Sequence, residues 1–158
     1  MRLLILLFLL FGAQSFETPI EEEIRSKFPY IKDKNEVENY ISKLDGRKDV
    51  ISQGYLASMY FFKSKYVKFP TTKFKFFKRG KELLNSLIEK NPKNIELRYI
   101  RYIFQHQIPK FLGYYNDKEL DFNILSSSGL EKRELLILLK LNSISEEHSQ
   151  KINQLLKQ

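Results

Sequence analysis

Three polar side chains near the middle of the chain have a spacing that could hold an anion. Arg98, Arg101 and Gln105 follow one another at intervals of three and four residues, so a helix would place them within about 60° of each other on one face. Two guanidinium groups and an amide can grip a carboxylate or a phosphate through forked hydrogen bonds. These residues form the first candidate ligand-binding site.

The same stripe also has a structural interpretation. Arginines on a helix that other helices cover commonly pair with acids, or with the carbonyl groups at helix ends. The acids that could serve as internal partners are Glu96, Glu119 and Asp121. We favour this structural interpretation for Arg98 and Arg101, and keep ligand binding as the alternative.

A second candidate is the basic, aromatic stretch of residues 63–81. It holds eight lysines and arginines and no acid, with phenylalanines and tyrosines between them, a pattern that can mark a nucleic-acid or membrane surface. One helical stripe of apolar and small residues nevertheless runs through and beyond this region, which would leave the basic side chains on the solvated side. Its members are Phe76, Phe77, Gly80, Leu83, Leu84, Leu87 and Ile88. The candidate basic surface residues are Lys73, Lys75, Lys78, Arg79 and Lys81. We favour a solvated face, with contact to an anionic glycan or lipid headgroup as the alternative.

Cysteine and histidine, two residue types that often carry catalysis or bind metals, are absent or rare in this chain. It has no cysteine, which excludes thiol catalysis, disulfides and thiolate metal sites. Its two histidines, His106 and His148, lack any metal-ligand spacing. We expect His106 on the aromatic side of its helix and His148 at the surface. The sequence therefore predicts no metal, no cofactor and no enzyme, with a carboxylate-based hydrolase as the residual alternative because such sites leave weak signals.

Residues 1–15 have the pattern of a secretory signal peptide. Met1 and Arg2 precede nine apolar residues, and Ala13 and Ser15 occupy the small positions of a cleavage site. The apolar run is far shorter than the roughly 20 residues that span a bilayer. We therefore expect cleavage near Ser15 and a periplasmic or extracellular protein that is not an integral membrane protein.

The charge balance favours anionic partners. Lysine and arginine outnumber aspartate and glutamate by 27 to 19, which gives a net charge of +8. Outside the cytoplasm such a charge points to glycans or lipid headgroups, and we expect no nucleic-acid partner.

The length and patterning of the chain predict one helical domain. The sequence has 158 residues, of which 42% are hydrophobic, enough for one compact core. Apolar residues recur at helical spacing along the chain, and no run of strict alternation predicts a strand. We expect an all-α domain over residues 16–158, either a single bundle or a short repeat-like array, with about seven to eight helices.

The stretch Asn91–Lys118 is the expected centre of this domain. Residues 94–107 predict a helix with apolar side chains on two opposite sides, and the polar stripe lies between them. The first apolar side holds Leu97, Ile100 and Phe104, and the second holds Ile95, Tyr99 and Tyr102. Helices should therefore pack on both sides, with the polar stripe left between them.

Two local features constrain the neighbouring helices. Gly54 lies inside a predicted helix, where glycine costs stability unless another helix packs closely against it. We therefore expect a close helix–helix contact at Gly54. Pro70, Thr71 and Thr72 predict the loop and cap between the next two helices.

One helix resembles the second half of a tetratricopeptide repeat. The residues that carry the resemblance are Gly80, Leu84, Leu87 and Pro92, at the positions of its small, large apolar and proline residues. Leu87 replaces a usual small residue, and no second copy follows at the period of the repeat. The resemblance implies one repeat-like helix pair.

The stretch 96–118 resembles a signature of uncharacterised exported helical bacterial proteins. The residues that carry it are Glu96, Arg98, Arg101, Gln105, Pro109, Phe111, Leu112, Gly113, Tyr114, Asp117 and Lys118. The resemblance implies a secreted helical fold. It implies no chemistry, because that family has no assigned activity.

These observations lead to two functional hypotheses. The first is a non-enzymatic exported domain that binds an envelope protein or peptide, or acts as a scaffold, through the surface of its stacked helices. The alternative is a binder of a small anionic ligand, an anionic glycan or a headgroup, through the Arg98–Arg101–Gln105 stripe or the basic surface.

Overall fold

The computed structural model describes residues 19–158, which fold as an all-α protein. Within that range there are eight α-helices, one short 3-10 helix and no strand, which confirms the predicted class and number of helices. The predicted signal peptide, residues 1–15, lies outside the described residues.

The helices are short at both ends of the chain and long between them. In chain order they are α1 (Pro19–Lys27), α2 (Lys34–Leu44), α3 (Val50–Tyr66), α4 (Pro70–Lys90), α5 (Ile95–Gln107), η1 (Lys110–Leu112), α6 (Lys118–Ser126), α7 (Lys132–Leu139) and α8 (Glu146–Leu155). None of the helices within residues 19–158 combines the length and the apolar character needed to cross a bilayer.

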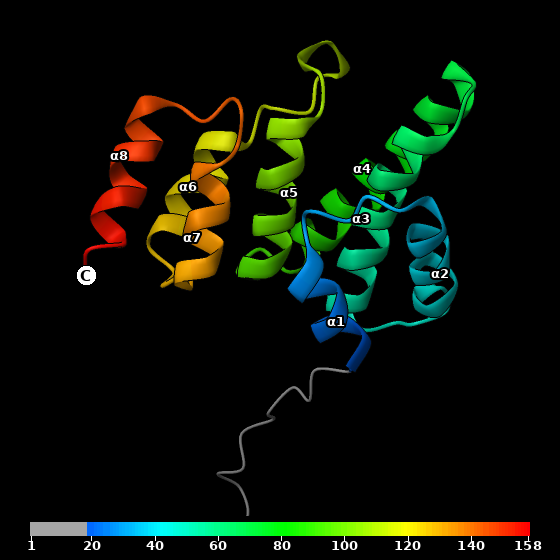
Figure 1. Ribbon diagram of the computed structural model, residues 1–158, viewed down its shortest axis with the longest axis horizontal. Helices are drawn as coiled ribbons and strands as arrows, with labels where there is room; N and C mark the ends of the chain where they lie inside the picture. The colour runs from blue at the N-terminus through cyan, green and yellow to red at the C-terminus, as the bar shows by residue number, and fades with distance from the viewer. Residues whose placement is uncertain (1–18) are drawn as a thin grey trace, which may run out of the picture.

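The helices stand side by side in a row, with α8 at one end and α2 at the other (Figure 1). The most extensive contact joins the two longest helices, α3 and α4. α5 contacts both of these on one side and α6 on the other. The central position predicted for α5 is therefore confirmed.

Side-chain caps fix the first residues of four helices. Each cap accepts a hydrogen bond from the backbone N–H three residues later, which satisfies a donor that the helix leaves unpaired. The caps are Asp33 for α2, Asp49 for α3, Asn94 for α5 and Ser145 for α8.

α4 begins earlier than the sequence predicts. Pro70 is its first residue, so Thr71 and Thr72 belong to its first turn, and the expectation that Pro70–Thr72 form a loop and cap is wrong. Proline suits this position because its fixed φ fits a helix and its missing N–H would be unpaired there. The cap residue is Phe69, which makes no side-chain cap hydrogen bond.

Aromatic rings fill the centre of the core. The Phe28 ring follows α1 and meets four other rings edge to face, with centroids 5.9–6.2 Å apart. Those rings are Tyr55, Phe62, Tyr99 and Phe104. Edge-to-face pairs at such distances are favourable beyond the area they bury, so this cluster binds α1, α3 and α5 into one core.

A contact from α7 ties the C-terminal part of the chain to α1. The guanidinium of Arg133 donates to the backbone carbonyl of Ser26 at 2.6 Å and to that of Phe28 at 3.2 Å. These carbonyls lie at the end of α1, where the helix leaves acceptors free. Segments more than 100 residues apart in sequence therefore meet through one side chain.

Two glycines allow α3 to approach its neighbours closely. A Cβ added at Gly54 would lie 2.5 Å from Cδ2 of Leu97 on α5. A Cβ added at Gly80 on α4 would lie 2.9 Å from the backbone oxygen of Ala57 on α3. The close helix contact predicted at Gly54 is thus present, and Leu97 forms it.

We expect Gly54→Ala to destabilise the protein by about 1–2 kcal/mol, the overpacking cost less the gain in helix propensity. Leu97 is fully buried, so it cannot move aside, and overpacking at such a site costs more than the ~1 kcal/mol that alanine gains in helix propensity. Urea denaturation measures the change in the free energy of unfolding. In a Leu97→Ala background, Gly54→Ala should lower the free energy of unfolding by less than it does in the unchanged protein. Equal losses in both backgrounds would show that Gly54 and Leu97 are not in close contact.

Candidate binding site

The two arginines of the predicted stripe share one buried carboxylate. Asp121 on α6 is fully buried, and Arg98 and Arg101 are each 6% exposed. Arg98 Nη1 lies 2.8 Å from Asp121 Oδ1, while Arg101 donates to Oδ2 at 2.6 Å and to Oδ1 at 2.7 Å. Burial alone would lower the pKa of Arg101, but the hydrogen bonds to Asp121 raise it above its ordinary value.

Two further contacts complete this network. Arg98 Nε donates to the backbone carbonyl of Pro92 at 2.8 Å, and Arg101 Nη1 lies 3.2 Å from Asp117 Oδ2. α6 packs over the stripe and supplies Asp121, one of the three acids considered as partners, as the structural interpretation of Arg98 and Arg101 predicts. Both guanidinium groups therefore join α5 to α6 by binding Asp121.

Gln105 belongs to the same helical face but not to the network. Its residue is 2% exposed, and neither its amide nitrogen nor its amide oxygen has a partner within the described part of the chain. The structure therefore brings Arg98 and Arg101 together around Asp121 and leaves Gln105 one turn away. None of the five pockets found in residues 19–158 is lined by Arg98, Arg101 or Gln105.

The other two acids considered as partners bind elsewhere. Glu96 accepts two hydrogen bonds from Arg25 of α1, at 2.8 and 2.6 Å, and a third from the hydroxyl of Tyr55. Glu119 lies 3.0 Å from Nε2 of His148. Each of these contacts joins helices that are distant in sequence.

His148 is buried, so its predicted surface position is wrong. Only 4% of the residue is exposed. Its ring stacks on that of Phe122, with centroids 3.6 Å apart, and its Nδ1 lies 2.8 Å from the hydroxyl of Tyr102. The imidazole contacts side chains of α6 and α5, while α8 itself packs against α6 and α7.

His106 lies at the aromatic end of α5. Its Nδ1 is 2.9 Å from the hydroxyl of Ser143, and its ring meets that of Tyr102 edge to face. Burial, reinforced by the charge of Lys118, lowers the pKa of His106 to about 4. Among residues 19–158, no three potential ligand side chains gather in an arrangement that could hold a metal ion.

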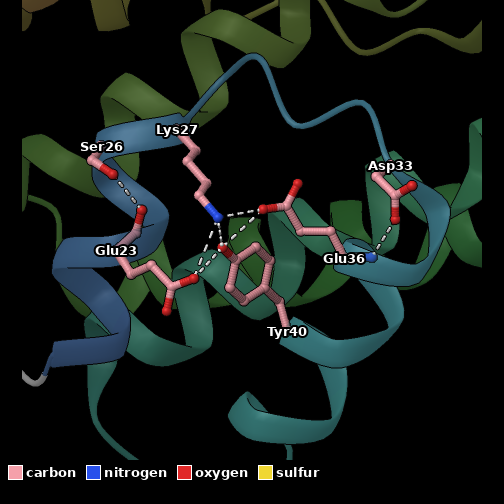
Figure 2. Close-up of polar contacts among 6 residues, drawn as sticks. All are labelled: Glu23, Ser26, Lys27, Asp33, Glu36 and Tyr40. Atoms are coloured by element: carbon pink, nitrogen blue, oxygen red, sulfur yellow. Dashed lines mark hydrogen bonds and ion pairs between the residues drawn. The ribbon is translucent and has the colours of Figure 1, made fainter.

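Two carboxylates meet a tyrosine and a lysine between α1 and α2 (Figure 2). The hydroxyl of Tyr40 lies 2.7 Å from Glu23 Oε1 and 3.1 Å from Glu36 Oε1, while Lys27 Nζ lies 2.6 Å from Glu36. Burial raises the pKa of Tyr40 to about 12. The hydrogen bond from Tyr40 lowers the pKa of Glu23, the opposite of what a general acid near neutral pH requires. This cluster serves to join the two helices.

The five basic surface residues on α4 do not form one patch. Lys78 lies 3.6 Å from Glu82, Arg79 stacks 4.2 Å above the ring of Tyr60, and Lys81 lies 5.7 Å from the centroid of Tyr114. Lys75 is exposed. Lys73 alone among the five faces a cleft lined by aromatic residues.

This aromatic cleft, as we call it, lies between the ends of three helices and η1. It has a volume of about 470 Å³. Its walls come from the last turns of α3 and α5, the first turns of α4, and the loop with η1. The lining residues are Phe61, Ser64, Lys65, Pro70, Lys73, Phe74, Phe77, Phe104, Gln107, Ile108, Pro109, Phe111 and Leu112.

The rim of the aromatic cleft exposes large apolar side chains to water. Phe111 is 86% exposed and Phe74 is 53% exposed, and Phe69, next to the lining residue Pro70, is 71% exposed. Clustered exposure of this kind is unusual on a protein that acts alone, and it marks surfaces that bind something. The cleft therefore replaces the buried arginine stripe as the candidate site.

Lysines supply the charge at the same rim. Lys65 donates to Gln107 Oε1 at 3.1 Å, and its Nζ lies 5.1 Å from the centroid of the Phe62 ring. Burial by these neighbours lowers the pKa of Lys65, although the residue as a whole is exposed. Within the described residues no aspartate or glutamate lines the cleft, so its field is positive.

The sequence pattern indicates only the part of the aromatic cleft that α4 contributes. The alternation of lysine and phenylalanine in residues 63–81 suggested a headgroup contact, and Lys73 and Phe74 do line the aromatic cleft. Phe111 and Leu112 were assigned only to a family resemblance. Their signal was an apolar pair held between Pro109 and Gly113, where Gly113 has a left-handed φ of 64° and turns the chain back.

The comparisons with known proteins add no assignment. No family model matches the chain, and neither a curated protein nor a solved structure matches it. The site must therefore be interpreted from its own geometry.

Removing the carboxylate of Asp121 should strongly destabilise the folded protein. We expect Asp121→Asn to lower the free energy of unfolding by about 3–5 kcal/mol, because two guanidinium groups would stay buried without their counter-charge. Asp117→Asn is the matched control: that side chain is 44% exposed, so its loss should cost less than ~1 kcal/mol. Urea denaturation measures both, and equal effects would contradict a dominant role for Asp121.

His106 should make stability depend on pH in the acidic range. The folded protein keeps His106 neutral down to about pH 4, whereas the unfolded chain takes up a proton below about 6.5. The stabilisation is therefore complete above pH 6.5 and is lost as the pH falls towards 4. We expect His106→Gln to remove this part of the pH dependence in urea denaturation, and an unchanged slope would contradict the assignment.

Proposed function

We propose that this protein is a non-enzymatic, exported binding module of the cell envelope. In this proposal the aromatic cleft holds an apolar group that belongs to an anionic partner. The proposal combines the two hypotheses drawn from the sequence. The protein is a binding module, and its anionic partner binds where the last turns of α3 meet the first turns of α4, beside basic residues.

The observation that carries the proposal is the aromatic cleft itself. Its lining is almost wholly apolar, with Phe74 and Phe111 largely in water and Lys65 and Lys73 beside them. Covering such side chains is favourable by about 25 cal/mol for each Å² of apolar surface. The lysines favour a partner whose polar part is negatively charged.

The polar clusters elsewhere support a non-enzymatic role. Asp121 pairs with two arginines. Glu23 pairs with Lys27 and accepts a hydrogen bond from Tyr40, so both carboxylates act as links between helices or within them. His148 is stacked and hydrogen-bonded on both nitrogens. A general acid or base must reach a substrate proton, and these groups are occupied by neighbours of the same chain.

The expected location outside the cytoplasm rests on the N-terminal pattern of residues 1–15. It narrows the anionic partners to glycans, lipid headgroups and acidic envelope proteins, and leaves nucleic acid out. Because the cleft is apolar, a partner with hydrocarbon or aromatic groups fits it better than a glycan does.

A fluorescent apolar anion tests the cleft. We expect anilinonaphthalene sulfonate to bind the folded protein, and the double variant Phe74→Ala, Phe111→Ala to bind it at least about tenfold more weakly, since each tenfold corresponds to 1.4 kcal/mol of lost burial. Fluorescence titration gives the dissociation constants, and circular dichroism checks that both proteins are folded.

The matched control removes apolar side chains that are exposed away from the cleft. Leu120 and Leu136 are 51% and 41% exposed, and the double variant Leu120→Ala, Leu136→Ala should bind the dye as the unchanged protein does. If both double variants weaken binding equally, or if neither does, the cleft is not the binding site.

A further inference from the structure

We propose that the anionic partner is a membrane surface: the rim of the aromatic cleft docks the protein on a bilayer that contains anionic lipids. This inference rests on the proposed function, since it names the partner of the same site. The docking surface consists of the α3–α4 turn with the helix turns on either side of it, and the η1 loop; its apolar contacts are Phe69, Phe74 and Phe111.

The two segments project from the same edge of the molecule. In Figure 1 the turn between α3 and α4 and the loop that holds η1 both lie at the top of the row of helices. Pro70 and Phe74, which follow the turn, line the same cleft as Phe111 of η1, so the two segments are close together in space. A flat surface can therefore touch both segments at once.

The distribution of exposed phenylalanines distinguishes a surface from a small ligand. Phe69 does not line the cleft and is 71% exposed, and Phe111 lines it but is 86% exposed. A ligand held within the cleft would leave Phe69 and much of Phe111 in water. A bilayer interface would cover all three phenylalanines, because their rings can enter the boundary between headgroups and acyl chains.

The charges of the docking surface have the sign that anionic headgroups require. Lys65, Lys68, Lys73 and Lys110 are all exposed and belong to the two segments. Neither residues 63–81 nor residues 107–116 contain an acid. Lysines beside anionic lipids are attracted to the negative surface potential, and this attraction acts only within a Debye length.

A protein partner fits the docking surface less well. The centres of protein–protein interfaces are depleted in lysine, and they carry about one hydrogen bond for each 100–200 Å². The cleft offers lysines among phenylalanines and few uncharged polar groups, mainly Ser64 and Gln107. Phenylalanine with lysine is instead the composition of surfaces that lie on membranes.

The docking is peripheral. Within the described residues no helix could span a bilayer, and the three phenylalanines come from a turn, the start of a helix and a 3-10 segment. Such short segments reach the interfacial layer and no deeper. Binding should therefore be reversible and should weaken as the salt concentration rises.

A single dye at the docking surface tests this inference in the full chain. The protein has no cysteine, so Phe69→Cys can be labelled with the environment-sensitive dye NBD, and Leu136→Cys on α7 provides a matched label elsewhere. We expect the dye at position 69 to brighten with vesicles of phosphatidylcholine and 30% phosphatidylglycerol but not with pure phosphatidylcholine. The dye at position 136 should respond to neither, so that attachment through another part of the chain, including residues 1–15, would be recognised.

Charge and aromatic variants complete the test. With the dye at position 69, a fourfold lysine variant should partition into the anionic vesicles at least tenfold more weakly; its changes are Lys65→Gln, Lys68→Gln, Lys73→Gln and Lys110→Gln. The double variant Phe74→Ala, Phe111→Ala should show a loss of the same size. The charge-matched control, glutamine at four exposed lysines elsewhere, should stay within twofold of the unchanged protein. Its positions are Lys132, Lys140, Lys151 and Lys157.

The outcomes separate the two proposals. If the vesicles leave the dye at position 69 unchanged while anilinonaphthalene sulfonate binds in the cleft, the inference is overturned and the cleft holds a free amphiphile. If neither vesicles nor the sulfonate bind, the proposed function fails as well. If both dye positions brighten equally, or if both sets of lysine variants weaken partition equally, the docking surface is wrong.

Discussion

The carboxylate of Asp121 determines how the C-terminal helices α6 and α8 pack on α5. It is fully buried, and it is matched by the guanidinium groups of Arg98 and Arg101 at 2.6–2.8 Å. A buried charge tolerates little displacement, because separation from its partners in a medium of low polarity is costly. The ion pairs therefore fix the position of α6 on α5. α8 follows from this arrangement, since His148 stacks on Phe122 of α6 and meets Tyr102 of α5.

Local features of the fold could be predicted from the sequence, and long-range ones could not. The caps at Asp33, Asp49 and Asn94 are encoded within one turn of the chain, so the starts of those helices follow from their own neighbourhood. The apolar stripe of α4 likewise predicts its buried face. The burial of His148 depends on where α8 packs, and this depends on contacts with residues 29 and 46 positions away.

The candidate site shows the same division. The spacing of Arg98 and Arg101 places both side chains on one face of a helix, but this is equally compatible with binding a ligand and with pairing to a carboxylate of the same chain. Only the fold reveals that α6 supplies that carboxylate. Conversely, Phe74 and Phe111 are 37 positions apart in sequence, and no local pattern connects them. Their shared cleft exists because α4 and α5 both contact α3, which brings the first turn of one beside the last turn of the other.

The link that Arg133 makes with the carbonyls of Ser26 and Phe28 has a consequence for cooperativity. Helices in a row contact mainly their immediate neighbours, so a row by itself can fray from either end in steps, as repeat arrays do. Arg133 connects the two flanks of the row across α5, and fraying of α7 therefore also frees the last carbonyls of α1. The end of α1 is therefore held both by the ring of Phe28 in the core and by a side chain of α7, a contact that packing between neighbouring helices alone would not provide.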